Sequence, residues 1–408
     1  MPSVKQKVPI CVLTTTRADY GILRPLIFSL AQDNTVELRL AVTGTHLLES
    51  FGMTVHEIEA DKLPIDVRVP IFSEANNSPE TMSQAMARAL TGFGAYFQAR
   101  CPRLLIVLGD RFETFAVCSA AVTACVPIAH LHGGETTEGA MDECFRHCIT
   151  KMSFLHFTAT ETYRKRVIQM GEAPERVFNV GALGVENALH TKFLSPKEID
   201  SYLNFPLSAR PYAVTTFHPV TLEAGMECVQ VNELLSAISQ RQDLNFLITK
   251  SNADIRGEHI NEMLDAFSKT HPNCCIVASL GMRRYMSALK YAAFVLGNSS
   301  SGLIEAPSFG IPTINIGNRQ QGRLQGESVI NCKPEKEDIL RAVDMALSAR
   351  FRSKAANGTN PYGDGKTSER ICKVIKEFLA LGRITPQKRF VDFQSVKTAA
   401  VSEERGTL

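Results

Sequence analysis

The 408-residue sequence lacks several features that would point to common functional classes. Charge of one sign is not in excess, because 44 Lys and Arg stand against 42 Asp and Glu, so no surplus of basic residues is available to neutralise a nucleic-acid backbone. Nor does the sequence contain a run of about 18 apolar residues, the length that a membrane-spanning helix needs. The composition therefore argues against nucleic-acid and membrane partners.

Motifs of several enzyme classes are also missing. No Gly-x-Gly-x-x-Gly follows an apolar run and no His-Glu-x-x-His occurs, which disfavours a dinucleotide-dependent oxidoreductase and a zinc peptidase. Residues 363–367 (GDGKT) resemble the end of a phosphate-binding P-loop, but the required first glycine is replaced by Asn360. Residues 297–301 (GNSSS) miss the nucleophile elbow of serine hydrolases, because the fifth position is Ser301. The sequence thus gives no reason to expect a cofactor or a metal ion.

The eleven cysteines form no recognisable framework. Their number is odd, no Cys-x-x-Cys pair occurs, and most stand within apolar runs, as Cys118 does. We interpret them as buried reduced thiols of a cytoplasmic protein. The apolar stretch after Lys7 is too short for a signal peptide and lacks its cleavage pattern, so we predict a buried strand there.

Short apolar runs alternate with helical patterns along most of the chain. Strands that are apolar on both faces, separated by helices, predict parallel sheets covered by helices on each side. Prolines between about 187 and 211 interrupt the pattern, which then restarts. We therefore predict an α/β protein with two Rossmann-like, doubly wound parallel-sheet domains facing a cleft. They span residues 1–190 and 191–381, and a solvated tail follows over 382–408.

The predicted elements can be given by their residue ranges. Strands are predicted at 8–14, 36–43, 104–109, 127–131, 154–159 and 176–180 in the first domain, and at 212–217, 244–249, 274–278, 293–296 and 311–316 in the second. Helices are predicted at 21–32, 79–98, 111–125 and 140–152, then at 226–241, 256–270, 283–291, 300–308 and 367–380. In such sheets, ligands bind beyond the carboxyl ends of the strands.

Polar residues follow two of the predicted strands in the first half. Arg17 comes after the first strand, and a guanidinium beside a helix N-terminus suits a phosphate or a nucleobase edge. An N-capping loop with a surface arginine is the alternative. Asp110 and Arg111 follow the strand at 104–109, and charges at the end of a buried strand are costly unless they are paired or face a cleft. An ion pair between these two residues is therefore the alternative to a functional site.

The densest set of ionisable side chains lies between residues 130 and 147. Glu135 follows two glycines, which let a ligand approach the backbone. Asp142 and Arg146 are four positions apart on a predicted helix, so their side chains meet on one face, either in a site or in a solvated surface pair. Together with His132, these groups could divide acid and base roles, since burial and neighbours push their pKa values apart.

The second half carries the residue types that recognise a diphosphate. His218 ends the first strand there, although a structural histidine is the alternative. Residues 299–301 lie in a predicted strand-to-helix turn, where hydroxyl and N–H groups form an anion site. Glu305 follows one or two turns later and could accept hydrogen bonds from a ribose. Arg319 and Arg323 end a further strand, so diphosphate binding without a metal is predicted.

In their order and spacing, these motifs resemble the hydrolysing branch of the UDP-N-acetylglucosamine 2-epimerases, the sialic-acid-pathway type. The matching segments are 17–20 (RADY), 109–111 (GDR), 132–135 (HGGE), 142–147, 149–151, 218–221 (HPVT), 297–300 (GNSS) and 317–320 (GNRQ). The resemblance runs from about residue 10 to about residue 325. It implies the fold of the B-type glycosyltransferases, with the acid/base cluster in residues 1–190 and the UDP moiety bound by residues 191–381.

The resemblance also implies residue roles. The substrate-binding residues are Arg17 and Ala18 on the uracil side, His218, Ser299, Ser300 and Arg319 at the diphosphate, and Arg111, Asn252 and Glu305 elsewhere in the nucleotide-sugar site. The catalytic set is Asp110, His132, Glu135, Asp142, Arg146 and His218. Some relatives carry a carboxylate where this chain has His132, which leaves the base open between His132, Glu135 and Asp142.

The implied reaction converts UDP-N-acetylglucosamine and water to N-acetylmannosamine and UDP through a glycal. It needs no cofactor, and we expect a cytoplasmic homo-oligomer, a dimer or a tetramer, whose only other partner is the UDP-sugar. One alternative is the same chemistry on UDP-2,4-diacetamido-2,4,6-trideoxyglucose, for legionaminic acid. The others are a B-type glycosyltransferase, which the acid/base cluster disfavours, and a non-catalytic nucleotide-sugar sensor.

Overall fold

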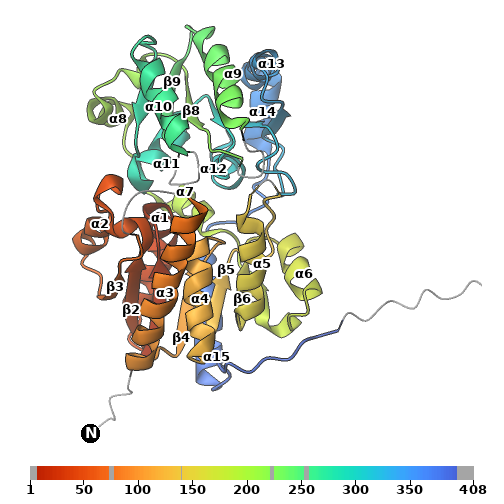
Figure 1. The fold of residues 1–408 in the computed structure, drawn as a ribbon. Helices are drawn as coiled ribbons and strands as arrows, with labels where there is room; N and C mark the ends of the chain where they lie inside the picture. The colour runs from red at the N-terminus through yellow and green to blue at the C-terminus, as the bar shows by residue number, and fades with distance from the viewer. Residues whose placement is uncertain (1–6, 73–77, 139, 221–224, 252–256, 393–408) are drawn as a thin grey trace, which may run out of the picture.

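The computed structural model describes residues 7–72, 78–138, 140–220, 225–251 and 257–392. Within these ranges, the chain forms two α/β units, one above the other in Figure 1, each built on a parallel sheet. The fold prediction of two doubly wound parallel-sheet domains is confirmed.

The first sheet has seven parallel strands in the order β3-β2-β1-β4-β5-β6-β7. Its strands are β1 (Val8–Thr14), β2 (Val36–Thr43), β3 (Ile65–Val69), β4 (Leu104–Leu108), β5 (Ile128–Leu131), β6 (Leu155–Thr158) and β7 (Val177–Asn179). Its helices are α1 (Arg17–Ala31), α2 (Val55–Ala60), α3 (Pro79–Ala99), α4 (Phe112–Thr123), α5 (Asp142–Met152), α6 (Glu161–Gln169) and α7 (Leu183–His190).

Alternation along β1 explains why both faces of this sheet are covered. Ile10 and Val12 pack in one core, which contains the buried side of α1, whereas Cys11 and Leu13 pack in another, which contains α3 and α4. Successive side chains of a strand point to opposite faces, so a strand that is apolar throughout requires a helix layer on each side.

The second sheet has six parallel strands in the order β10-β9-β8-β11-β12-β13. Its strands are β8 (Tyr212–Thr216), β9 (Asn245–Thr249), β10 (Cys274–Val277), β11 (Phe294–Gly297), β12 (Thr313–Ile316) and β13 (Val329–Cys332). The helices that follow α7 are α8 (Pro196–Leu203), α9 (Glu227–Ser239), α10 (Gly257–Ser268), α11 (Gly281–Tyr291), α12 (Ser301–Ile304), α13 (Lys336–Leu347), α14 (Ala349–Asn357) and α15 (Thr367–Ala380).

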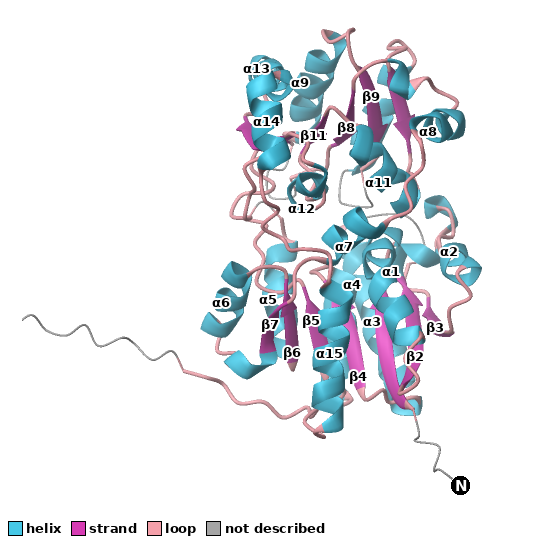
Figure 2. Ribbon diagram, turned by 180° about the vertical axis from the view of Figure 1, so that it is seen from behind, coloured by secondary structure: helices cyan, strands magenta, loops and turns pink. Residues whose placement is uncertain are grey.

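The last helix returns to the first sheet. Ile371 and Ile375 of α15 are buried in the same core as the inner side of α1, and the chain continues with the buried Ile384. Figure 2 shows α15 lying against the strands of the first sheet. The second domain was predicted to extend to residue 381. In the structure, α15 packs on the first unit instead, because its apolar face is buried in that core.

Helix boundaries differ from the predictions where local caps act. Helix α1 begins at Arg17, four residues before the predicted start, because Thr16 and Asp19 form a capping box. The helix predicted at 300–308 is instead the short α12 followed by a 3₁₀ helix at Ala306–Phe309. Pro307 has no N–H to continue an α-helical ladder, which accounts for the break.

Some elements have no counterpart among the predictions. Strand β3 contains the charged Asp66 and Arg68 and lies at a sheet edge, so it does not read as a buried apolar run. Strand β13 is likewise a short edge strand, with an exposed Asn331. Helices α2, α6, α7, α8, α13 and α14 were not predicted either. Their polar faces and short lengths weaken the periodic signal on which such predictions depend.

The cysteines are all free, but the prediction that they are buried is wrong for five of them. The exposed thiols are those of Cys101, Cys125, Cys144, Cys148 and Cys228.

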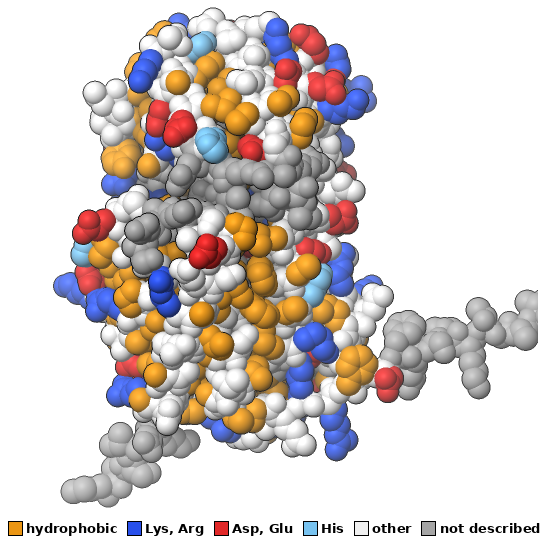
Figure 3. All heavy atoms as spheres, viewed as in Figure 1, with side chains coloured by type: hydrophobic (Ala, Val, Ile, Leu, Met, Phe, Trp, Pro, Cys, Tyr) orange, Lys and Arg blue, Asp and Glu red, His pale blue; other side chains and the backbone are white. Residues whose placement is uncertain are grey.

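Apolar side chains gather on the outer face of α3 and α4, where Leu90 and Val122 are exposed by 43% and 48% (Figure 3). In the described part of the chain, no helix combines the length and the apolarity needed to cross a membrane.

Candidate functional site

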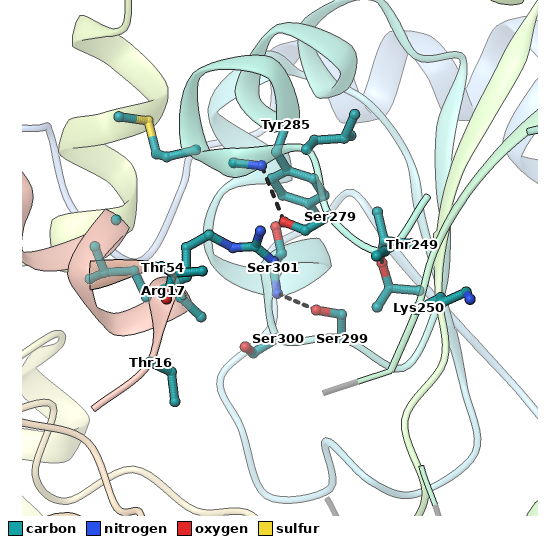
Figure 4. A pocket seen from close by; sticks show the side chains of 18 of the residues that line it. Thr16, Arg17, Thr54, Thr249, Lys250, Ser279, Tyr285, Ser299, Ser300 and Ser301 are labelled. Carbon is teal, nitrogen blue, oxygen red and sulfur yellow. Dashed lines mark hydrogen bonds between the residues drawn. The ribbon is translucent and has the colours of Figure 1, made fainter. Parts of the chain in front are cut away.

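The site lies where the strand order reverses in both sheets. In the first sheet the reversal falls between β1 and β4, and in the second between β8 and β11. A crevice forms at the carboxyl ends of such strand pairs because their connections leave in opposite directions. Loops that follow these four strands border a cavity of about 340 Å³ between the two units. Figure 4 shows Thr16 and Arg17 on the α1 side of this cavity and Ser299, Ser300 and Ser301 on the α12 side.

The loop after β1 presents Arg17 and Ala18 to the cavity. The Asp19 carboxylate accepts hydrogen bonds from the backbone N–H groups of Thr15 and Thr16, both at 2.8 Å, and from the Thr14 hydroxyl at 2.9 Å. Asp19 therefore stabilises the turn, and Arg17 takes no part in these hydrogen bonds. Burial lowers the pKa of the Arg17 guanidinium, which still carries its charge.

Asn298, fully buried, ties together three segments of the opposite wall. Its amide oxygen accepts from the His218 N–H at 2.7 Å, and its amide nitrogen donates to the His218 carbonyl at 2.8 Å. Arg319 Nη1 donates to the Asn298 carbonyl at 3.1 Å. The preceding Gly297 has a φ of +133°, and a Cβ there would lie 2.0 Å from the Thr216 carbonyl oxygen. The hydroxyls of Ser299 and Ser300 are thus held beside an imidazole and a guanidinium.

Glu305 lines the same cavity and is 6% exposed. Burial raises the pKa of its carboxyl group to about 7. Gly184 of α7 makes room for it, because a Cβ at that position would lie 1.9 Å from Glu305 Oε1. The carboxyl group can therefore change its charge near neutral pH.

A second set of ionisable groups surrounds Arg146, whose side chain is 1% exposed. Its guanidinium pairs with Asp110 and, at 2.5 Å, with Glu143. It also donates to the Glu135 carbonyl at 3.1 Å and to the Thr137 hydroxyl at 2.6 Å. A buried guanidinium requires such compensation, and here it fixes the relative positions of two carboxylates.

His132 and Glu135 form the other part of this set. His132 has a φ of +65°, which is strained for a non-glycine residue, and its Nδ1 lies 3.0 Å from Glu135 Oε1. Arg323 reaches over from the second unit, and its Nη2 lies 3.1 Å from Glu135 Oε2. Burial would raise the pKa of Glu135, but the charge of Arg323 and the hydrogen-bonding contact with His132 outweigh it and lower the pKa to about 2. Nε2 of His132 is buried and has no hydrogen-bond partner within the described ranges.

The two sets adjoin. Arg111 lines the cavity and directly follows Asp110. Arg323, which pairs with Glu135, is also close enough to Glu305 for its charge to oppose the effect of burial on the pKa of that carboxyl group. Arg111 is held by the fully buried Glu113, with Nη2 to Oε1 at 3.0 Å. The cavity and the buried acid/base groups therefore form one site at the junction of the two units.

The structure brings most of the predicted residues into these two sets. The cavity is lined by Arg17, Ala18, Arg111, His218, Ser299, Ser300, Glu305 and Arg319. The buried set contains Asp110, His132, Glu135 and Arg146. Asp142 begins α5, half-buried, one residue before Glu143, and its pairing with Arg146 stays a prediction. Asn252 lies outside the described residues.

Other residues of the site were not assigned a role from the sequence. Lys250, Ser279 and Tyr285 line the cavity, and Glu143 and Thr137 bind Arg146. Lys250 follows β9, so its strand-end position was a usable signal. Nothing local marks Ser279 or Tyr285, because the packing of the second unit against α1 brings them to the cavity.

Comparisons with known proteins agree with this geometry. The sequence profile of the family described as UDP-N-acetylglucosamine 2-epimerase matches residues 29–376. "Polysialic acid biosynthesis protein P7" of Escherichia coli is 38% identical over 394 residues, which are 96% of this chain and 99% of that protein. A "GDP/UDP-N,N'-diacetylbacillosamine 2-epimerase (hydrolyzing)" of Campylobacter jejuni is 36% identical, covering 95% and 99% of the two chains.

A "UDP-N-acetylglucosamine 2-epimerase" of Neisseria meningitidis is 30% identical, covering 94% of this chain and 98% of that protein. Among solved structures, a putative UDP-N-acetylglucosamine 2-epimerase from Listeria monocytogenes superposes with a TM-score of 0.78 at 19% identity, covering 95% and 99% of the two chains. At that identity the likeness shows the fold, the two-domain arrangement of the B-type glycosyltransferases. By its sequence, this chain belongs to the UDP-N-acetylglucosamine 2-epimerase family.

Proposed function

We propose that the protein is a hydrolysing 2-epimerase that converts UDP-N-acetylglucosamine and water to N-acetylmannosamine and UDP, for sialic acid biosynthesis. The observation that carries the proposal is the junction of two unlike sites. One wall offers hydroxyl, imidazole and guanidinium groups suited to a diphosphate, and a buried set of acids and bases adjoins it. Relatives at 36% and 30% identity are named as epimerases of UDP-sugars, and the first of them as hydrolysing.

The reaction divides into an elimination and a hydration. A base removes the proton from C2 of the sugar while the bond between C1 and the diphosphate oxygen breaks, which leaves a C1–C2 double bond and releases UDP. Water then adds its oxygen to C1, and an acid delivers a proton to C2 from the opposite face. Acid and base groups of this kind typically contribute 10² to 10⁴-fold each, and charge stabilisation on the leaving diphosphate adds to that.

For the C2 base, we propose His132. Its Nε2 is buried and has no hydrogen-bond partner in the described part of the chain, so a lone pair is available when Nδ1 carries the hydrogen and faces Glu135. Glu135 is a poor base, because Arg323 and His132 hold its pKa at about 2. Asp110 is paired with Arg146, which favours a role in orienting the sugar or the returning proton.

For the leaving group, the proposed contacts are those of the second unit. The side chains of His218, Ser299, Ser300 and Arg319 line one wall of the cavity and would bind the diphosphate, as developing negative charge there needs donors. Arg17 and Ala18 would meet the uracil on the other wall, and Glu305 the ribose hydroxyls. Arg111 would lie between the two groups.

A second candidate has the same chemistry on another sugar. The Campylobacter relative is named for GDP/UDP-N,N'-diacetylbacillosamine, whose sugar has acetamido groups at C2 and C4 and no hydroxyl at C6. This is the sugar of the legionaminic acid route. The acid/base set and the diphosphate wall serve both substrates equally, so substrate preference is decided by the groups that surround C4 and C6.

One experiment tests these assignments together. The protein is incubated with each UDP-sugar in D₂O and the products are followed by NMR. Free 2-epimerised sugar with deuterium at C2, plus UDP, is the expected outcome, and the sugar consumed identifies the substrate. A product still attached to UDP would refute the hydrolytic step. Absence of turnover with either sugar would favour a glycosyltransferase or a nucleotide-sugar sensor.

Three expectations complete the proposal. Asp142→Asn should lose turnover far more than substrate binding, and near-normal turnover would remove Asp142 from the mechanism. The two units should close on the nucleotide, which small-angle scattering with and without UDP would detect. The expected homo-oligomer stays a prediction, and sedimentation of Leu90→Glu and Val122→Glu variants would test whether the apolar face of α3 and α4 is involved.

A further inference from the structure

His130 is a fully buried histidine that the proposed mechanism does not use. It lies on β5, with Nε2 2.7 Å from the Gly109 carbonyl oxygen and Nδ1 3.2 Å from the Thr150 hydroxyl. A carbonyl oxygen can only accept a hydrogen bond, so Nε2 carries the hydrogen, and Nδ1 therefore accepts from Thr150. Both ring nitrogens are thus satisfied in a single tautomer.

The ring of His130 contacts the two loops that carry the proposed acid/base groups. Gly109 directly precedes Asp110, so the hydrogen bond from Nε2 fixes the backbone from which that carboxylate projects. On the other side, Gly133 lies so close that a Cβ there would be 3.0 Å from His130 Nδ1 and 3.0 Å from the Thr150 hydroxyl. Gly133 stands between His132 and Glu135 in the chain. One imidazole therefore touches both loops.

We propose that His130 is a positioning residue that sets the distance between the Asp110 loop and the loop of residues 132–135. Small displacements of reacting groups are costly, since about 1 Å can lower a rate 10²-fold. The inference deepens the proposed function and rests on it for its kinetic test.

His130 does not act as an acid or a base. Burial lowers the pKa of its imidazole to about 3, and the neighbouring charges of His156 and Arg146 act in the same direction, whereas the Gly109 carbonyl and Asp110 oppose it. The ring is therefore neutral throughout the pH range of an assay. Replacing His130 should therefore leave the shape of the pH–rate profile unchanged, whereas replacing a catalytic proton donor would change it.

The chain offers a matched control. His156 stands on the next strand, β6, directly opposite His130 in the sheet register, and it too is fully buried. Its Nε2 lies 3.1 Å from Glu172 Oε2, in a cluster with Lys151 and Lys388. Replacement of His156 should therefore cost stability of the same sheet without displacing the two loops.

The experiment compares His130→Leu, His130→Gln and His156→Leu with the wild type. For His130→Leu we expect kcat to fall by about 10 to 100-fold with KM changed less than about threefold, and the affinity for UDP to be retained in calorimetry. The Gln variant can donate its amide hydrogen to the Gly109 carbonyl and should recover much of the loss. His156→Leu should lower the melting temperature and leave kcat within about twofold. Equal kcat values for the two Leu variants would overturn the proposal.

A crystal structure of His130→Leu separates this inference from the proposed function. If the wild type turns over no UDP-sugar, the proposed function fails, and the position of Asp110 still decides the inference. We expect the Asp110 carboxylate to move away from Arg146. The expected shift is larger than the displacement of about 0.5 Å that a catalytic site tolerates. An unmoved Asp110 loop would refute the positioning role. If His130→Leu does not fold, the same measurements on His130→Gln decide.

Discussion

Replacing Arg323 by Met tests the contact that joins the two units at the acid/base set. The guanidinium lies 3.1 Å from Glu135 Oε2, and the two side chains are 10% and 3% exposed. Methionine keeps an unbranched side chain, shorter than that of arginine, and removes the charge. Glu135 then stays buried beside the His132 ring, with the Arg146 guanidinium as its remaining nearby positive charge. We expect a marked loss of stability, because a buried carboxylate loses its strongest partner.

Two lines of reasoning give the same magnitude. Breaking a buried ion pair by removal of one partner typically costs 3–5 kcal/mol. The pKa of Glu135, lowered from 4.5 to about 2, corresponds to about 3 kcal/mol at about 1.4 kcal/mol for each pH unit. Arg323 is the largest favourable contribution to that lowering. An expected loss of about 3 kcal/mol in the free energy of unfolding follows.

The pH dependence of this loss has a definite sign. Because the pKa of Glu135 is depressed in the folded protein, its contribution is complete above the unfolded value of about 4.5 and is lost as the pH falls toward about 2. The difference between wild type and variant should therefore be largest near pH 7 and smaller by about 1 kcal/mol at pH 4. Urea unfolding followed by circular dichroism measures both differences.

Arg241→Met is the matched control. Arg241 pairs with Asp243 and Asp344, whose side chains are 60% and 77% exposed, so solvent screens these pairs. Such pairs contribute about 1 kcal/mol or less. If Arg323→Met costs no more than Arg241→Met, the pair between Arg323 and Glu135 does not hold the acid/base set together, and the reasoning is wrong.

Three further predictions concern the cavity and the chain end. Gly184→Ala should fold, since the three atoms nearest to the new Cβ all belong to the Glu305 side chain, which can turn away. The displaced carboxyl group should weaken UDP binding about tenfold in calorimetry, and unchanged affinity would contradict the ribose assignment. Because the pKa of Glu305 is about 7, its carboxylate fraction grows between pH 6 and pH 8, so UDP affinity should rise over this range in the wild type and stay flat in Glu305→Gln. Lys388→Met removes a 2.8 Å partner of the buried Glu172, so the melting temperature should fall by a few degrees while kcat is unchanged. A fall in kcat would show that the chain end is coupled to the site.

The positions of the proposed site loops were predictable because they depend on local patterns. Strands β1, β4, β8 and β11 are short apolar runs that end in polar residues, and in a parallel sheet these ends gather at one edge. Arg17, Asp110, His218 and the serines at 299 and 300 were located in this way. The capping box of Thr16 and Asp19 was equally local, although the predicted helix began four residues too late.

The partners of these residues were not predictable in the same way. Arg146 was expected to meet Asp142 four positions away, which stays a prediction, whereas the structure pairs it with Asp110, 36 positions away and on another loop. Arg323 reaches a loop 188 positions before it, at Glu135. Periodicity indicates which face of an element is buried, but it contains no information on which distant element covers that face.

The sequence by itself determined the two parallel sheets, the strand ends that supply polar side chains, and the family to which the motifs belong. The tertiary structure decided which charges neutralise one another, because two units had to dock before Arg323 could hold Glu135 and Gly184 could make room for Glu305. It also decided that α15 completes the first core rather than the second. Burial then set the ionisation of the site, since a pKa depends on solvent exclusion and neighbouring charge, which exist only in the folded chain.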